Sequence, residues 1–233
     1  MKETIVTIPV NDLFGPKDGC PLCRMEGMLE DQYCEFVTGD AMMEPAVRVE
    51  TNKTGFCHRH YAKMTRVGQR LPNALILETH LQEIEEKLLP QKAAKPDKKQ
   101  MAALGEMLDS CYVCDRVRAD MLHLLATVFV EWAKGGEFKT LYKEQPFICL
   151  EHYRLIMNAA TGKRGVPSKL LGEFHADTLA LTKNYLAELR RDIGHFVMMF
   201  DYRSKGLEWG TSVDAIERSI QFLTKESVDP AGN

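Results

Sequence analysis

The sequence predicts an all-α protein made of two tandem helical units, each pinned by a zinc ion, packed into one globule behind a short extended N-terminal arm. Three observations support this prediction. Apolar residues recur at helical spacing along most of the chain. A Cys-x-x-Cys pair is followed by a distant Cys-x-x-His pair, and the chain repeats this pattern. Only the stretch Thr4–Val10 looks extended, and Pro9 restricts it to a sheet edge or a loose arm.

The N-terminal arm is expected over residues 1–16. Its first 15 residues lack an apolar stretch of signal-peptide length. No run in the chain approaches the roughly 20 apolar residues of a membrane span. We therefore expect a cytoplasmic protein, in which paired cysteines favour metal binding over structural disulfides.

The first unit is expected over residues 17–89. It contains Cys20-Pro-Leu-Cys23 and, 34 residues later, Cys57-His-Arg-His60. Apolar residues at helical spacing follow the first pair, and a second stripe closes the unit. These stripes are interpreted as core-facing: Leu22, Met25, Leu29 and Phe36, then Leu77, Leu81, Ile84 and Leu88. A Pro- and Lys-containing linker is expected over residues 90–100.

The second unit is expected over residues 101–200, with Cys111-Tyr-Val-Cys114 and, 35 residues later, Cys149-Leu-Glu-His152. The offset between the patterns is 91 residues from Cys20 to Cys111 and 92 from Cys57 to Cys149, which indicates an internal duplication. Residues 201–233 are expected to form a tail loop and a closing helix. The core-facing stripes of this half are Val113, Val117, Met121, Leu124 and Val128; Phe174, Leu181, Tyr185, Leu189 and Phe196; and Val213, Ile216, Ile220 and Leu223.

Three thiolates and one imidazole suit a closed tetrahedral zinc site, so two zinc ions are expected. The predicted ligand sets pair within each unit: Cys20, Cys23, Cys57 and His60, then Cys111, Cys114, Cys149 and His152. Swapped pairing, in which the Cys-x-x-Cys of one unit meets the Cys-x-x-His of the other, remains open. An iron–sulfur cluster also remains an alternative cofactor, because three cysteines and a histidine occur as cluster ligands.

Four further residues carry chemistry that the patterns do not use. His58 neighbours His60, but the second unit has Leu150 at its place, so His60 is the better ligand. Cys34 is interpreted as a small buried residue, with a reactive thiol as the alternative. His80 and His175 hold similar places in the two halves, and their role stays open.

The charge balance argues against bulk nucleic-acid binding, because the net charge is −3. A local basic cluster nevertheless follows the first Cys-x-x-His and keeps this function as an alternative: Lys53, Arg59, Lys63, Arg66 and Arg70.

Several longer motifs resemble one known family. They are Thr7-Ile8-Pro9-Val10, the Cys20–Cys23 knuckle, Met43–Asn52, Gly55–His60, Thr79–Glu83 and Phe200–Gly210. Together they make the chain similar, over nearly its whole length, to an uncharacterised bacterial family with a domain of unknown function. The resemblance implies no activity, but it implies that the paired Cys and His motifs are a family pattern.

The functional prediction is a cytoplasmic zinc-binding protein with two structural Cys3His sites. Its expected role is that of a non-enzymatic interaction or scaffold protein with an unidentified protein partner. The first alternative is an iron–sulfur or thiol redox protein, and the second is a nucleic-acid-binding zinc protein. The sequence predicts no catalytic residue and no reaction, and it leaves the oligomeric state open.

Overall fold

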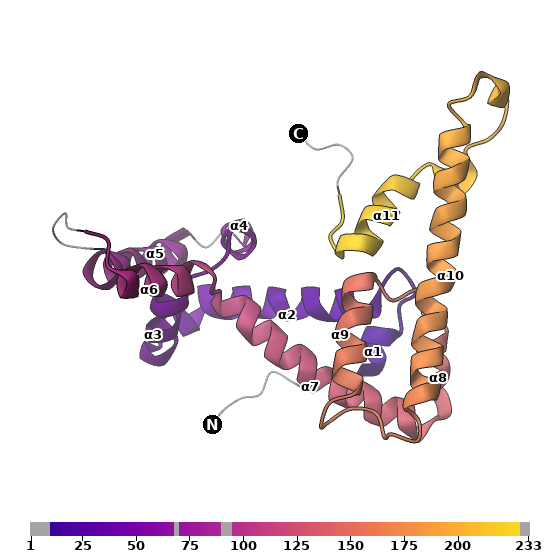
Figure 1. The fold of residues 1–233 in the computed structure, drawn as a ribbon. Helices are drawn as coiled ribbons and strands as arrows, with labels where there is room; N and C mark the ends of the chain where they lie inside the picture. The colour runs from indigo at the N-terminus through magenta and orange to yellow at the C-terminus, as the bar shows by residue number, and fades with distance from the viewer. Residues whose placement is uncertain (1–9, 68–69, 90–94, 229–233) are drawn as a thin grey trace. The chain divides into compact units, whose positions relative to one another are not determined.

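The computed structural model describes residues 10–67, 70–89 and 95–228, and every regular element in these ranges is a helix (Figure 1). The all-α prediction is therefore confirmed. The longer helices are α1 (Val10–Phe14), α2 (Pro21–Thr38), α3 (Pro45–Thr54), α4 (His58–Arg66), α5 (Arg70–Glu83), α6 (Lys98–Leu108), α7 (Tyr112–Lys134), α8 (Gly136–Lys143), α9 (Leu150–Ala160), α10 (Leu171–Met198) and α11 (Ala215–Thr224). Four shorter ones are η1 (Asp40–Met43), the π-helical η2 (Ile84–Leu88), η3 (Tyr202–Ser204) and η4 (Gly210–Ser212). Among these described helices, none is both long enough and apolar enough to cross a membrane.

The chain forms two compact units whose boundaries fall inside α2 and α7. Unit 1 takes in the chain up to Met25 and again from Leu122 onward, and unit 2 is the continuous segment Glu26–Met121. These units differ from the expected tandem division at residues 17–89 and 101–200. The reason is that α2 and α7 each begin in one unit and end in the other.

Unit 1 is built around α10, which packs against α8, α9 and α11 (Figure 1). Its core is aromatic. The ring of Phe174 on α10 lies 5.0 Å from the ring of Trp132 and 5.5 Å from that of Tyr142, measured between centroids. Phe14 of α1 stacks on Tyr142, with 5.7 Å between centroids. Phe14, Trp132, Tyr142 and Phe174 are fully buried, so together they supply a large share of the apolar area removed from water.

Unit 2 centres on α3, which packs against α5 and α6. Polar contacts hold α3 to α5. Arg48 on α3 donates to the Leu75 carbonyl and to the Thr79 hydroxyl, and Thr79 donates to Asn52 on α3. His80 on α5 lies with Nδ1 2.7 Å from the Asn52 carbonyl oxygen. These bonds satisfy Nη2 of Arg48 and the Thr79 hydroxyl, whereas Nη1 of Arg48 is buried without a hydrogen-bond partner among the described residues.

The expected N-terminal arm is only partly covered by the structure, because residues 1–9 lie outside the described ranges. From Val10 to Phe14 the chain is the helix α1 rather than extended, and Val10, Leu13 and Phe14 are buried. Residues 90–94 of the expected linker also lie outside the described ranges. The end of that linker is helical, because α6 begins at Lys98 with the side chain of Asp97 accepting from the Lys99 amide.

The apolar stripes divide into correct and incorrect predictions. The five residues of the α7 stripe are all buried, as expected for the core. By contrast, Leu77 and Leu81 on α5 are 37% and 60% exposed, and Ile216 and Leu223 on α11 are 42% and 55% exposed. The residues that α5 and α11 bury lie one or more positions away: Pro72, Asn73, Ile76 and His80 on α5, and Ala215 and Phe222 on α11.

Candidate metal centres

Two groups of four side chains can each hold a metal ion, and the ligand atoms of each group lie within 4.8 Å of one another. We call them the unit 1 cluster (Cys20, Cys23, Cys149 and His152) and the unit 2 cluster (Cys57, His60, Cys111 and Cys114). All eight predicted ligands are brought into these groups, but the pairing within each tandem unit is wrong. The Cys-x-x-Cys of each pattern meets the Cys-x-x-His of the other.

Helix length explains the swapped pairing. The 18 residues of α2 span about 27 Å at 1.5 Å per residue, and the helix begins in unit 1, with Cys23, and ends in unit 2, which contains Cys57. The 23 residues of α7 span about 35 Å and carry the chain away from Cys114 in the same way. The Cys149–His152 motif, which follows α7, therefore completes the unit 1 cluster. The Cys57–His60 motif, which follows α2, completes the unit 2 cluster.

Every ligand pair lies at the start of a helix. Cys57 and Cys149 are the N-cap residues of α4 and α9, which places His60 and His152 in the first turns. Cys20 and Cys111 immediately precede α2 and α7, and Pro21 opens α2 at a position where no amide hydrogen bond is lost. Positive partial charge at a helix N-terminus stabilises thiolates, so this placement favours metal-binding cysteines.

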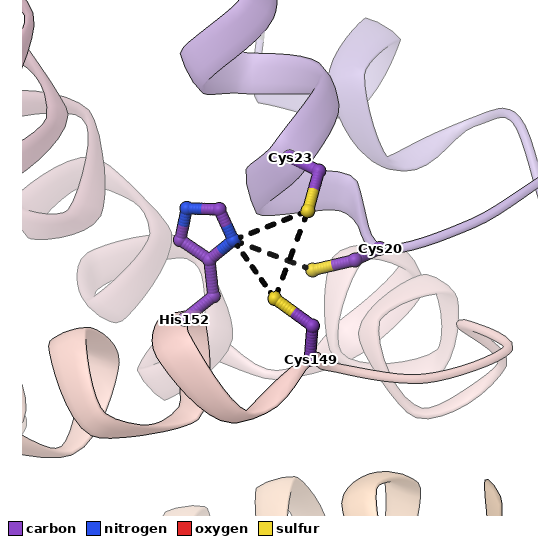
Figure 2. Close-up of side chains that lie close together, drawn as sticks. All are labelled: Cys20, Cys23, Cys149 and His152. Carbon is purple, nitrogen blue, oxygen red and sulfur yellow. Dashed lines mark hydrogen bonds between the residues drawn. The ribbon is translucent and has the colours of Figure 1, made fainter. Parts of the chain in front are cut away.

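Figure 2 shows the four side chains of the unit 1 cluster pointing toward one another, and the distances between their ligand atoms fit a single tetrahedral ion. The Nδ1 atom of His152 lies 3.2 Å from the sulfur of Cys149, 3.3 Å from that of Cys23 and 3.8 Å from that of Cys20. The sulfurs of Cys23 and Cys149 are 3.7 Å apart. Zinc bonds of about 2.3 Å to sulfur and about 2.0 Å to nitrogen imply tetrahedral edges of about 3.8 Å and about 3.5 Å, respectively.

The unit 2 cluster repeats this geometry. The Nδ1 atom of His60 lies 3.2 Å from Cys57, 3.3 Å from Cys111 and 3.4 Å from Cys114, and the sulfurs of Cys57 and Cys114 are 3.9 Å apart. His58, on the same turn, is exposed, which confirms His60 as the member of the group.

The thiols of each cluster are strongly coupled. Hydrogen bonding by Cys114, followed by that of His60, lowers the pKa of Cys111 to about 3, and the same contact raises the pKa of Cys114. In unit 1, burial alone would raise the pKa of Cys20, but hydrogen bonds from Cys149 and Cys23 hold it well below its usual value. Each cluster therefore stabilises a thiolate, which is the form that binds metals.

A buried carboxylate that the sequence analysis missed lies beside the unit 2 cluster. Glu30 on α2 is 3% exposed, and its Oε1 lies 3.5 Å from His60 Nε2. Burial by itself would raise the pKa of Glu30, but His60, Arg59 and Lys63 together lower it, so the group is ionised at neutral pH. The available signal was its position, since Glu30 interrupts the apolar face of α2 between Leu29 and Tyr33.

The remaining candidates lie outside the clusters. Cys34 is fully buried, and burial raises its pKa to about 11, which matches a packing role better than a reactive thiol. His80 contacts the backbone of α3, as described above. His175 is exposed, and its Nε2 lies 2.9 Å from the Tyr153 hydroxyl.

Comparison with known proteins supplies the family but no activity. A family described as a family of unknown function, DUF6062, matches residues 1–230. The chain belongs to this family. No curated protein and no solved structure matches it. Within the DUF6062 chain, the clusters are therefore the features from which function must be argued.

Proposed function

We propose that this DUF6062 protein is a cytoplasmic zinc-binding protein in which two structural Cys3His sites support a non-enzymatic interaction or scaffold role. The observation that carries the proposal is the set of near-tetrahedral distances in both clusters. Four protein ligands around one zinc leave no position for water or substrate, which is typical of structural sites. Zinc bound there would hold the starts of two helices together, α2 with α9 and α4 with α7, and would link its binding free energy to folding.

The donor spacing favours one ion over a cluster of irons. An iron–sulfur cluster places an inorganic core between its thiolates, which spreads them farther apart than the ligands of one ion. The local basic cluster also gives weaker support to nucleic-acid binding than its sequence suggested. Two of its five residues, Arg59 and Lys63, form ion pairs with Glu30, and Lys63 also pairs with Asp31.

Metal content and a visible spectrum of protein purified without oxygen test the proposal directly. Two equivalents of zinc and no visible absorbance are expected, and chelation should lower the melting temperature. Iron with sulfide and a brown colour would instead establish the redox alternative. If the protein contains no bound metal and its melting temperature does not change when zinc is added, both the zinc proposal and the iron–sulfur alternative are refuted.

The partner surface that we propose is the outer face of α5 and η2. Leu77 and Leu81 lie four residues apart on α5 and are exposed, and Ile84 and Leu88 continue the apolar stripe, here called the seam, into the π-helical η2. Exposed Glu78, Glu85 and Glu86 flank the seam. This combination fits an amphipathic helix of another protein that carries Leu on one face and Lys or Arg beside it.

A synthetic helical peptide with Leu at the seam positions and Lys at the flanking ones can probe this face by calorimetry. Binding should be lost in Leu81→Gln and retained in Leu207→Gln, a control at an exposed leucine in unit 1. A scrambled peptide of the same composition that binds equally well would refute the proposal. Self-association that Leu81→Gln abolishes would assign the face to a second copy of this chain instead.

A further inference from the structure

One carboxylate of unit 2 contacts the histidine ligand from the side opposite the sulfurs. His60 presents Nδ1 to the three thiols, and its Nε2 lies 3.5 Å from Oε1 of Glu30. This contact is longer than a normal hydrogen bond, so Nε2 is a buried group without a hydrogen-bond partner among the described residues, and Glu30 is a carboxylate beside it. The side chains of Glu30 and His60 are 4% and 2% exposed, so water has little access to this contact. A carboxylate in this position favours the tautomer in which Nε2 carries the proton and Nδ1 offers its lone pair to a metal.

The same carboxylate is held by two cations from α4. Arg59 lies 2.6 Å from Glu30 Oε1, and Lys63 lies 3.4 Å from Oε2. Because a buried carboxylate is costly unless it is paired, these cations explain how Glu30 can remain ionised in this position. They also offset charge, since zinc with three thiolates carries a net charge of −1 and Glu30 adds another.

We propose that Glu30 is a positioning residue of the unit 2 metal site: when a metal is bound, its carboxylate attracts the Nε2 proton of His60, aims Nδ1 at the ion and slows metal release. The inference rests on the proposed function, because it requires that the cluster bind a metal. It assigns to Glu30 a role that the pattern of metal ligands does not reveal.

The second sequence pattern provides an internal comparison. An offset of 91 residues, which carries Cys20 onto Cys111, carries Glu30 onto Met121, a buried apolar residue. The carboxylate is therefore specific to one of the two patterns. A change at Glu30 should alter one metal equivalent and leave the other as it is.

The test measures zinc transfer from the full-length protein to a coloured chelator. Glu30→Met introduces the residue found at the corresponding place in the other pattern. It should speed release of one of the two zinc ions by about 10- to 100-fold, the usual effect of removing such a partner. Glu30→Gln, which keeps an oxygen acceptor without the charge, should have an intermediate effect.

Two controls separate positioning from general loosening. Glu35→Gln removes an exposed carboxylate from the same helix, and its zinc release should match the wild type. Arg59→Gln breaks the ion pair but keeps the contact between Glu30 and His60, so it should change release much less than Glu30→Met. Equal effects of Arg59→Gln and Glu30→Met, or an unchanged rate in Glu30→Met, would overturn the inference.

A measurement on the unmodified protein guards against a variant that fails to fold. In the zinc-loaded protein, long-range proton–nitrogen NMR should show His60 protonated at Nε2, with slow exchange of that proton with water. Fast exchange at Nε2 would overturn the role of Glu30, whereas a proton on Nδ1 would contradict metal binding through that atom. Absence of bound metal in the wild type would instead refute the proposed function, so the two failures are distinguishable.

Discussion

At the scale of single residues, Gly55 occupies a position, two residues before Cys57, where both the backbone conformation and the neighbouring side chain exclude other residue types. Its φ is +57°, and a Cβ at this position would lie 2.6 Å from His80 Nε2. Its carbonyl accepts the amide of Tyr112, which follows Cys111. A side chain at this position would therefore strain the backbone, displace His80 and disturb the start of α7.

Gly55→Ala should lower the free energy of unfolding by about 1–3 kcal/mol through the strained backbone alone, with the contact to His80 adding to this. The matched control is Gly105→Ala on α6 of the same unit, where no neighbouring atom of the described residues lies within 4 Å of an added Cβ. That control should be neutral or slightly stabilising, because Ala favours helices over Gly. Thermal unfolding of the zinc-loaded proteins compares them, and equal melting temperatures would contradict this account.

The members of the two Cys and His clusters could be predicted from the sequence, whereas the place of Glu30 beside His60 could not. A Cys-x-x-Cys or Cys-x-x-His spacing places two donors on one helical turn, so local sequence identifies them. The partner of Glu30 lies 30 positions away at His60, and only the packing of α2 against α4 brings them together. Single residues of a site can thus be predicted where the interacting residues are close together in the sequence.

At the scale of elements, α11 is held by a polar contact that its apolar pattern does not indicate. Arg218 on α11 donates to Asp192 on α10 at 2.7 Å and lies 3.2 Å from Glu188. The side chain of Asp192 is only 5% exposed. Removing Arg218 would therefore leave a nearly buried carboxylate without its main partner.

Arg218→Met should cost about 3 kcal/mol, at the lower end of the range for breaking a buried ion pair. Hydrogen exchange should show loss of protection over Ala215–Thr224 while α7 keeps its protection. Ser219, which bonds the Ala215 carbonyl within the same helix, offers the control Ser219→Ala. Equal loss of protection in α7 would indicate global rather than local destabilisation.

The pH dependence of this contact has a definite sign. Burial opposes ionisation, but Arg218 and Thr211 together lower the pKa of Asp192 below its ordinary 3.8. The stabilisation is therefore complete above that value and is lost as the pH falls through the lowered pKa. After correction for intrinsic exchange rates, α11 should be equally protected at pH 7 and pH 6.

At the scale of elements, periodicity predicts that a helix has an apolar stripe but does not decide which face of the helix is buried. The stripe on α7 is correct, since all five of its residues are buried. On α5 and α11 the stripe was assigned to the core, yet packing chose Ile76 and His80 on one helix and Phe222 on the other. On these two helices the tertiary packing, and not the apolar spacing, determines which residues are buried.

At the scale of the whole molecule, the main uncertainty in the sequence was which motif meets which. The two Cys-x-x-Cys to Cys-x-x-His separations are nearly equal, so the sequence does not distinguish tandem from swapped pairing. Separation along the chain does not determine which motifs lie close together in space. The lengths of α2 and α7 decide the outcome. Each compact unit therefore contains ligands from both sequence patterns, and neither pattern can complete its own site.

Metal stoichiometry of two full-length variants tests this topology. The first replaces all four members of the unit 1 cluster, with Ser for Cys and Ala for His, and should retain one zinc per chain in the intact unit 2 cluster. The second replaces the same number of ligands but takes both motifs of the first pattern, Cys20, Cys23, Cys57 and His60. It should bind almost no zinc, because each cluster keeps only two donors and a four-ligand site is required for tight binding.

Tandem pairing demands the opposite result, one zinc in the second variant and none in the first. Since both variants lose three thiols and one imidazole, the difference between them reports the pairing rather than the number of ligands lost.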